Sequence, residues 1–588
     1  MGANLFFGST GAVLDVTGTP LDATLIEAWR SRVERATRPF AWHPPHTVVR
    51  PHASGVQLAF AAPFDQLFLA TEINEWALSS ALLAADPVRW NGLEAALRAQ
   101  ALEHATPPNP AASLPPVLQE SAAFTRFARL ASLESQPKLA GLLAAAAARF
   151  LPSALDETTL TLGAGTGGRD FPLGALPDEA AVPWDQLSDI PTALVTGSNG
   201  KTTTVRLLAA CARAAGWHAG YNCTDGVYLD DELLASGDYA GPAGARLVLR
   251  DRRTQAAILE TARGGILRRG IAVSQASVAV VTNVSADHFG EWGIDNLADL
   301  AATKLTVAAA VRRRGVLVLN AEDPLLRAQA GELPRRLGRR PVFGWFSATP
   351  DSPALAAVKA DGDLTCGVSG GRLRLTHGSV THDLGAIANM PLSIGGLAGY
   401  NVANLAGAAL AAVALGIAPA VIIEVFAHFG ARLEDNPGRM MRFDRDGVVV
   451  LIDYAHNPDG LRGFLAVASH LCRAGSRLAT ILGQAGNRRD ADVAELVRVA
   501  ASFRPDLVVV KETEGLLRGR APGEMPQLIR ALLLRHGLPE SALPMADTEL
   551  DAARQALRWA RPGDVVALPL HVKSARQAIL AELQSPRS

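Results

Sequence analysis

The residues best suited to chemistry stand in one short run: Gly197, Ser198, Asn199, Gly200, Lys201, Thr202 and Thr203. The apolar residues 192–195 before it predict a buried strand, and an amphipathic helix follows it. Glycines let backbone N–H groups approach an anion, and a helix N-terminus adds partial positive charge. We therefore expect the run to bind the phosphates of ATP, with Lys201 on the β- and γ-phosphates and the Thr202 hydroxyl on Mg²⁺. The alternative is a plain glycine turn, which Gly-Lys-Thr-Thr directly after a strand disfavours.

Further polar residues follow the predicted strands of the same region. Glu260 ends the strand 256–260, Asp287 and His288 follow the next one, and Lys304 lies in the helix after that. Each alone has an ordinary explanation, namely a helix cap, a structural histidine or a solvated lysine. Because ligands of parallel sheets bind at the carboxyl ends of the strands, we expect Glu260, His288 and Lys304 to join Lys201 in one catalytic site. An acid at position 260 suits Mg²⁺, which prefers oxygen ligands.

The elements that must position these residues form an α/β pattern from about residue 186 onward. The length of 588 residues predicts three domains: an α+β domain over 1–185, a central ATP-binding domain over 186–431 and a Rossmann-like domain over 432–588. The last domain carries no Gly-x-Gly-x-x-Gly after its first strand, so we expect no dinucleotide site there.

The apolar pattern predicts individual elements in each domain. Expected strands are 4–7, 46–50, 56–60, 193–196, 256–260, 278–283, 316–320, 448–452, 478–482, 507–510 and 565–568. Expected helices are 66–85, 90–104, 120–150, 399–415, 458–472 and 491–501. Residues 341–391 are expected to be rich in short strands. The Pro-rich segment 106–116 and the Gly-rich segment 161–168 are expected to be linkers.

Composition excludes several classes of protein. The formal net charge of −1 offers no basic excess for a nucleic-acid partner. Four cysteines, Cys211, Cys223, Cys366 and Cys472, lack metal-ligand spacing and are expected to be reduced thiols. No signal peptide is visible, and the Ala-rich run 142–148 is too short to span a bilayer. We therefore expect a cytoplasmic protein with no membrane partner.

Several motifs together resemble the Mur ligase family, and within it the Mur-ligase half of cyanophycin synthetases. The phosphate loop has Val195 where the commonest loop has glycine, and its shorter spacing resembles that of Mur ligases. The resemblance covers about 186–575 and rests on the runs TGSNGKTTT (196–204), TDGVY (224–228), ETARGGILR (260–268), NVSADHFG (283–290), GYNV (399–402), NPGRM (436–440) and DYAHNP (453–458). It implies a Mur-ligase-like fold.

The resemblance also implies roles for single residues. Lys201 and Thr202 would bind the triphosphate and Mg²⁺, and Glu260 and His288 would be metal ligands. Lys304 matches a lysine that becomes a carbamate in several relatives. Asn401 and Asn404 match positions that contact adenine. Arg439, Asp453 and His456 would close on the nucleotide from the last domain.

The activity implied by the resemblance is ATP-dependent amide formation through an acyl phosphate, with small peptides or amino acids as substrates. The 185 residues ahead of the central domain are too few for the ATP-grasp half of a cyanophycin synthetase, so we expect a single ligase site. The N-terminal domain is expected to bind substrate or to mediate assembly, and a homo-oligomer is possible. The alternatives are a Mur ligase of another branch, for wall precursors or folylpolyglutamate, and a silent ATP-binding partner of a synthetase.

Two further observations concern the substrate. Asn487 stands where relatives usually have aspartate. If the amine is arginine, its guanidinium needs carboxylates. Candidates near predicted strand ends of the last domain are Asp459, Asp490, Glu512 and Glu514.

Overall fold

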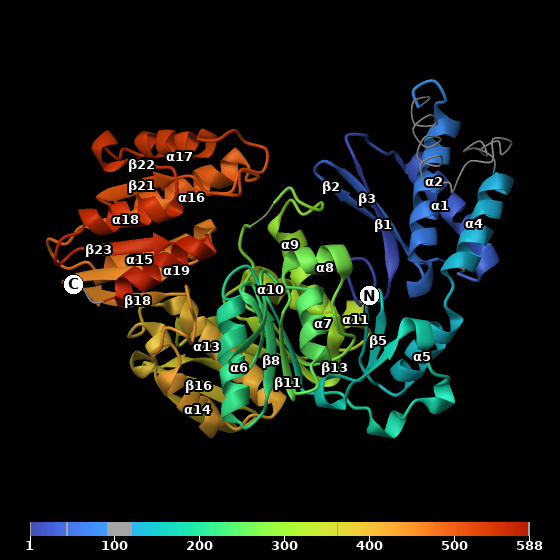
Figure 1. Ribbon diagram of the computed structural model, residues 1–588, viewed down its shortest axis with the longest axis horizontal. Helices are drawn as coiled ribbons and strands as arrows, with labels where there is room; N and C mark the ends of the chain where they lie inside the picture. Colours follow the sequence, from blue (N-terminus) through green and yellow to red (C-terminus); the bar gives the residue numbers. More distant parts are fainter. Residues whose placement is uncertain (1, 43–44, 91–119, 288, 361–362, 586–588) are drawn as a thin grey trace.

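The computed structural model describes residues 2–42, 45–90, 120–287, 289–360 and 363–585. Figure 1 shows a central domain with the N-terminal part of the chain on one side and the C-terminal domain on the other. The fold is α/β, as expected, with two mainly parallel sheets flanked by helices and an α+β N-terminal part.

The central domain is built on an eleven-stranded sheet of order β10-β9-β8-β11-β7-β12-β13-β14-β15-β16-β17. The seven strands from β8 to β15 in this order are parallel, and antiparallel hairpins extend both edges. The strands are β7 (Thr192–Thr196), β8 (Ala219–Cys223), β9 (Gly226–Leu229), β10 (Glu232–Ser236), β11 (Ala256–Glu260), β12 (Ala276–Val281), β13 (Val311–Asn320), β14 (Val342–Pro350), β15 (Leu364–Ser369), β16 (Arg372–His377) and β17 (Val380–Ala386). All residues of β7 and β11 are buried, as expected for parallel strands covered on both faces.

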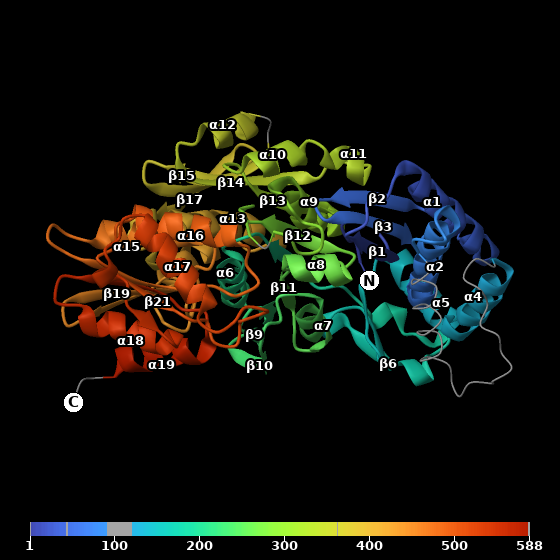
Figure 2. The same ribbon diagram turned by 90° about the horizontal axis from the view of Figure 1, so that it is seen from above.

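Helices cover both faces of this sheet (Figure 2). One face packs against α6 (Lys201–Ala214), α13 (Gly399–Leu415) and α14 (Pro419–His428). The other packs against α7 (Pro242–Arg250), α8 (Arg263–Arg269), α9 (Leu297–Lys304), α10 (Pro324–Ala330), α11 (Leu333–Leu337) and α12 (Pro353–Ala360). Because β7 lies between β11 and β12, the loops that leave these three strands meet at one edge.

The C-terminal domain has a six-stranded sheet of order β18-β19-β23-β20-β21-β22, parallel except for β18. Its strands are β18 (Met441–Arg445), β19 (Val448–Asp453), β20 (Leu478–Leu482), β21 (Leu507–Lys511), β22 (Met545–Ala546) and β23 (Val565–Pro569). One face packs against α15 (Pro458–Leu471), α16 (Asp490–Ser502) and α17 (Glu524–Arg535), and the other against α18 (Glu549–Trp559) and α19 (Lys573–Gln584).

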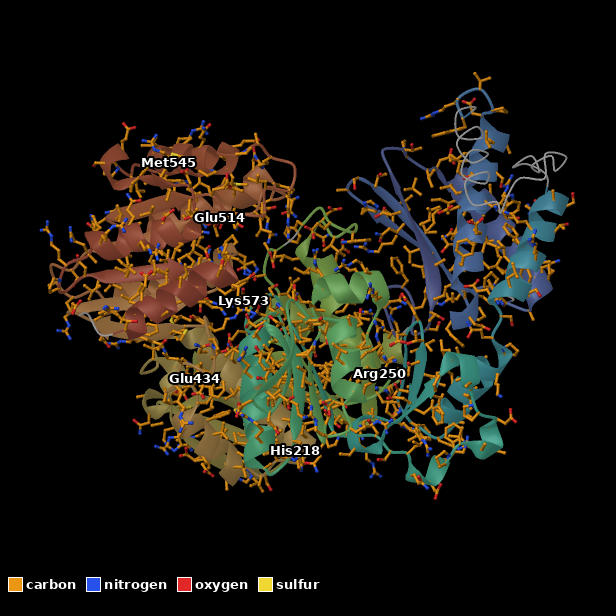
Figure 3. The ribbon with its side chains drawn as sticks, viewed as in Figure 1. His218, Arg250, Glu434, Glu514, Met545 and Lys573 are labelled. Carbon is orange, nitrogen blue, oxygen red and sulfur yellow. The ribbon has the colours of Figure 1, made fainter. Side chains whose placement is uncertain are left out.

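The N-terminal part contains two small antiparallel sheets. The first, β1 (Gly11–Thr17), β3 (Gly55–Ala61) and β2 (Thr47–His52), packs on α1 (Ala23–Thr37), α2 (Leu67–Ala85) and α4 (Glu120–Glu134). The second, β4 (Ser153–Leu155), β5 (Thr159–Leu162) and β6 (Arg169–Pro172), packs on α5 (Pro137–Ala148). Arg250 of α7, labelled in Figure 3, joins this sheet to the central domain through Asp156 and the Thr159 carbonyl.

A segment of the central domain enters the core of the C-terminal domain. Ile394, Leu397, Ala398 and Tyr400 pack in the cluster formed by α15, α16 and α17. The fit is close, since a Cβ on Gly463 of α15 would lie 2.9 Å from the Tyr400 ring. The two domains therefore share apolar packing.

Most predicted strands and helices are present, but three expectations were wrong and some strands were missed. Residues 4–7 form no strand, β1 was not predicted, and 120–150 is divided into α4 and α5, with Pro137 opening the second helix. The segment 161–168 is not a flexible linker, because it includes the end of β5 and packs against the central domain. A Cβ on Gly165 would lie 2.1 Å from the Thr254 carbonyl, so glycine serves close packing there. The predictions for 91–104 and 106–116 lie outside the described residues.

Within the described ranges, no helix is long and apolar enough to cross a bilayer. The four cysteines are unpaired thiols, and three of them are buried.

Candidate active site

The loop between β7 and α6 has the backbone that a phosphate site needs. Gly200 has φ 84° immediately before α6, and a Cβ there would lie 2.2 Å from the Asn404 amide oxygen. A Cβ on Gly197 would lie 1.8 Å from the Thr282 hydroxyl. Both positions therefore require glycine, for conformation and for space. The loop leads its N–H groups into the N-terminus of a fourteen-residue helix, which favours an anion.

Contacts with the loop after β12 fix the phosphate loop. The Asn199 N–H donates to the Asn283 side chain at 2.9 Å, and the Ser198 hydroxyl donates to the Ser285 carbonyl at 2.9 Å. The Lys201 ammonium folds back on its own loop and donates to the carbonyls of Gly197 and Ser198, each at 3.0 Å. These bonds define the shape of the cradle.

Glu260 lies beside Thr202, at the end of the neighbouring strand β11. The hydroxyls of Thr202 and Thr224 donate to its two carboxylate oxygens at 2.8 and 3.3 Å. Glu260 is only 1 % exposed, and burial raises its pKa despite the opposing effects of Lys201 and the Thr202 hydroxyl. A buried carboxylate with two hydroxyls is an oxygen donor set that suits a hard divalent cation.

The donor set of Glu260 and the two threonine hydroxyls suits Mg²⁺, which takes part of its coordination from water and substrate, better than it suits a metal ion that protein groups alone would bind. No group of three or more His, Cys, Asp or Glu with metal-binding geometry occurs among the residues described. Mg²⁺ commonly binds through one or two carboxylates together with water and substrate phosphates. Thr202 and Glu260 are the residues that would hold it here.

A pocket opens over the phosphate loop, and both the central and the C-terminal domains line it. The predicted site residues along it are Ser198, Asn199, Gly200, Lys201, Thr202, Thr203, Glu260, Asn401, Asn404, Arg439, Asp453 and His456. The remaining lining residues are Thr224, Asn283, Tyr400, Tyr454, Ala455, Asp459 and Gly460. The C-terminal domain thus covers the phosphate loop, and the residues that it contributes to the pocket form the roof of the site.

Two predicted site residues do not line the pocket, and a third is not among the described residues. Gly197 lies beneath the loop and does not line the pocket. Lys304, at the end of α9, is only 3 % exposed and also does not line it. Burial and the nearby charge of Lys201 hold the pKa of Lys304 well below its usual value. His288 lies outside the described residues.

The two predicted adenine contacts lie at the start of α13 and are nearly fully buried. Asn401 donates to the Leu392 carbonyl at 3.0 Å, and Asn404 donates to the Asn401 amide oxygen at 3.1 Å. Asn404 also lies directly against Gly200. It is therefore at the phosphate-loop end of the pocket, and its assignment to adenine remains a prediction.

The roof of the pocket comes from the loop after β19. Asp453 accepts hydrogen bonds from the N–H groups of Met440 and Ala455 at 2.7 and 2.8 Å. Burial raises the pKa of Asp453 although the Arg439 charge opposes the shift. The Arg439 guanidinium lies 4.1 Å from the Tyr454 ring centre, where a cation is attracted by the π-face. His456 lies 3.5 Å from the Asp287 carboxylate of the central domain.

A buried network supports this loop from inside the C-terminal domain. His571 Nε2 lies 3.1 Å from the Ala455 carbonyl, so this nitrogen carries the proton. Glu549 accepts from the backbone N–H groups of His571 and Val572 at 2.8 and 2.7 Å, and it pairs with Lys511 at 2.5 Å. Lys511 and Glu549 are both fully buried. The loop is therefore held in place independently of a ligand.

Of the four carboxylates considered for an amine, only Asp459 lines the pocket. Asp490 pairs with Arg520, Glu512 accepts from the Gly523 N–H at 2.8 Å, and Glu514 accepts from the Glu549 N–H at 3.2 Å. Thr224, Tyr400 and Tyr454 line the pocket but were not assigned to it from sequence. Thr224 directly follows β8, so the rule that selected Glu260 would have found it.

Comparisons with known proteins agree with this arrangement. Residues 195–412 match the Mur ligase middle domain, and residues 438–568 match the domain described as Mur ligase, glutamate ligase domain. The chain belongs to the Mur ligase family. The two matches include the phosphate loop, Glu260 and the DYAHNP run. As a Mur ligase family member, the chain carries the family's middle and C-terminal domains in sequence order.

Its relatives include a cyanophycin synthetase of Synechocystis sp., 37 % identical over 67 % of this chain and 44 % of the relative. A UDP-N-acetylmuramoyl-L-alanyl-D-glutamate–2,6-diaminopimelate ligase of Geobacter metallireducens is 28 % identical over 64 % of this chain and 73 % of the relative. The chain thus spans less than half the length of the cyanophycin synthetases it matches. A similar solved structure is Mycobacterium tuberculosis folylpolyglutamate synthase complexed with ADP and AMPPCP, with 17 % identity, a TM-score of 0.48, and coverage of 68 % of this chain and 92 % of that one.

Proposed function

We propose that the protein is an ATP-dependent, ADP-forming ligase that joins an amine to a carboxylate through an acyl phosphate. The observation that supports it most is the pocket itself, in which Lys201, Thr202 and Glu260 face Arg439 and His456 of the C-terminal domain. This constellation suits transfer of a phosphoryl group from ATP to a substrate carboxylate. An amine then displaces phosphate from the acyl phosphate, and ADP and phosphate are released.

The chain's own residues supply positioning and charge. The N–H groups of the loop and the Lys201 ammonium would bind the phosphates and neutralise charge in the transition state. Thr202 and Glu260 would hold Mg²⁺, which when bound would supply Lewis-acid stabilisation of the developing charge. Arg439 would approach the nucleotide from the roof. The roof would also keep water away from the acyl phosphate, which is hydrolysed easily.

For the substrates, we propose an amino acid as the amine and an aspartyl-type peptide as the acceptor. Identity with cyanophycin synthetase is 37 %, against 28 % for the diaminopimelate ligase, which favours cyanophycin-related chemistry over a wall precursor. A ligase of another branch is the alternative within the family. A silent ATP-binding partner is the alternative outside enzymes, and the complete set of Lys201, Glu260 and Lys304 argues against it.

The test is coupled ADP release and mass spectrometry of the products. Arginine, lysine and neutral amino acids are paired with aspartate-containing peptides, with Lys201→Ala as the inactive control. The expected result is an amide product formed stoichiometrically with ADP. A product only with a muramyl or folyl acceptor would move the protein to the other branch. ATP binding without turnover on any pair would favour the silent partner.

A further inference from the structure

A buried carboxylate joins the central and C-terminal domains close to the pocket. Asp225, in the turn after β8, accepts from Arg576 of α19 at 2.7 Å and lies 3.3 Å from Arg206 of α6. The side chains of Asp225, Arg576 and Arg206 are 11 %, 7 % and 6 % exposed. One guanidinium therefore comes from each domain, and the carboxylate lies between them.

The charges at this position are strongly coupled. Burial by itself would raise the pKa of Asp225, but the positive charges of Arg439, Arg576 and Arg206 outweigh it and lower the pKa. The carboxylate is therefore ionised at neutral pH. Removing one member of such a buried set leaves the others without compensation, which costs far more than breaking a surface pair.

Both ends of the Asp225 contact lead into the pocket. On the C-terminal side, Arg576 packs on the backbone of Gly438, where an added Cβ would lie 2.4 Å from the arginine Cδ, and the next residue is Arg439. On the central side, the preceding residue is Thr224, whose hydroxyl donates to Glu260 at 3.3 Å. The adjacent residues Thr224 and Asp225 thus contact Glu260 and the C-terminal domain, respectively.

We infer that Asp225 is a positioning residue that holds the C-terminal domain closed on the pocket and keeps Arg439 in line with the phosphate loop. The role of Asp225 in turnover rests on the proposed function. The closure of the two domains by this contact does not depend on that function. The Asp225–Arg576 contact and the Thr224–Glu260 contact come from the same short turn. A ligand that binds Glu260 therefore also acts on the turn that joins the two domains.

A nearby contact between the same two domains offers a matched control. Lys573, at the start of α19 and labelled in Figure 3, is one partner of this contact. It donates to the Ser236 hydroxyl of β10 at 2.7 Å. Lys573 is exposed, and its loss should have little effect, since exposed polar contacts contribute little. Lys573→Ala thus removes an interdomain hydrogen bond from the same helix as Arg576 without touching the buried carboxylate.

The test compares Asp225→Asn, Arg576→Gln, their double variant and Lys573→Ala. Small-angle scattering measures domain closure, calorimetric titration measures ADP affinity, and steady-state assays give kcat and KM for ATP. We expect each single variant to be more open than wild type and to bind ADP about tenfold more weakly, with the double variant no worse than either. Lys573→Ala should match wild type in both measurements.

Two controls separate a positioning role from a loss of fold. Thermal melting reports whether the variants fold. Arg576→Lys keeps the positive charge but loses the planar, multiply donating guanidinium, so it should show an intermediate effect. Closure and ADP affinity like those of wild type in Asp225→Asn, or fully additive losses in the double variant, would overturn the inference. If wild type forms no amide product while closure still depends on Asp225, the proposed function fails and the positioning role stands.

Discussion

The side-chain amides of Asn199 and Asn457 hydrogen-bond to each other in both directions, at 2.9 and 3.2 Å. Asn199 belongs to the phosphate loop, whereas Asn457 precedes α15 in the C-terminal domain and accepts from the Gly460 N–H at its N-terminus. The part of the chain that cradles phosphate is therefore bonded directly to the part that covers it.

Breaking this pair should weaken nucleotide binding without disrupting α15. Asn457→Ser removes the amide but retains a side-chain oxygen that can cap the helix. We expect it and Asn199→Ala each to raise the Kd for ADP about fivefold, which corresponds to about 1 kcal/mol for the two lost bonds. A double-mutant cycle measured by calorimetric titration should show strong coupling. Independent losses would indicate that the pair does not act in binding.

Lys201→Ala should abolish turnover and leave the fold intact. Among the described residues, the Lys201 ammonium bonds only to the carbonyls of its own loop, so its loss removes no hydrogen bond between the domains there. Removing one preorganised charge from a phosphoryl-transfer site should lower kcat by on the order of 100-fold or more. ADP release measures this effect, and the melting temperature serves as the control. Turnover within about tenfold of wild type would contradict the assignment of the loop.

Glu260→Gln should change the dependence on Mg²⁺. The substitution keeps the shape and an oxygen for the Thr202 hydroxyl, but it removes the negative charge that would face the metal. We expect activity to fall about 100-fold at low Mg²⁺ and to recover only partly at high Mg²⁺. Rates titrated against Mg²⁺ provide the measurement. The same curve for variant and wild type would make Glu260 a purely structural residue.

Lys304→Met should make the protein more stable at neutral pH while abolishing activity. The folded state holds the pKa of Lys304 well below its usual value, so the unfolded chain binds the extra proton in the range between the two values. Stability therefore rises with pH across that range, and burial of the amine costs stability below it. Calorimetry in bicarbonate-free buffer over neutral to alkaline pH should show a higher Tm and a flatter pH profile for the variant. An unchanged profile would show that Lys304 is not a buried neutral amine.

His571→Gln should remove a loss of stability in mild acid. Burial, with a contribution from Lys511, holds the pKa of His571 well below its usual value, so the folded protein keeps the ring neutral while the unfolded chain takes a proton. The stability present above the unfolded pKa of about 6.5 is lost as pH falls below it. Glutamine can still donate to the Ala455 carbonyl but does not titrate. Denaturant unfolding at about pH 7.5 and 5.5 should show a smaller loss for the variant than for wild type. Equal losses would argue against the neutral ring.

The sequence was most informative where local pattern and position decide the structure. The apolar runs predicted β11, β20 and α13 with the bounds that the structure has, because a short unbroken apolar run is typical of a buried parallel strand and a long one of a buried helix. The phosphate loop was predictable because its glycines and Lys201 are adjacent in the chain. The Asp225–Arg576 contact was not, since 351 residues separate its members and nothing in the TDGVY run, which includes Asp225, points to Arg576 as its partner. Segment 161–168 was misread because glycine serves close packing as well as flexibility.

The apolar seam formed by Ile394, Leu397, Ala398 and Tyr400 has a consequence for fragments of the chain. A protein cut at about residue 432 would leave these side chains on one piece and their partners, including Leu461 and Phe464 of α15, on the other. Each piece would then expose a contiguous apolar surface, which promotes self-association. The central and C-terminal domains are therefore expected to be expressed well only as one polypeptide. A domain exchange with a relative should transfer residues 394–400 together with the C-terminal sheet.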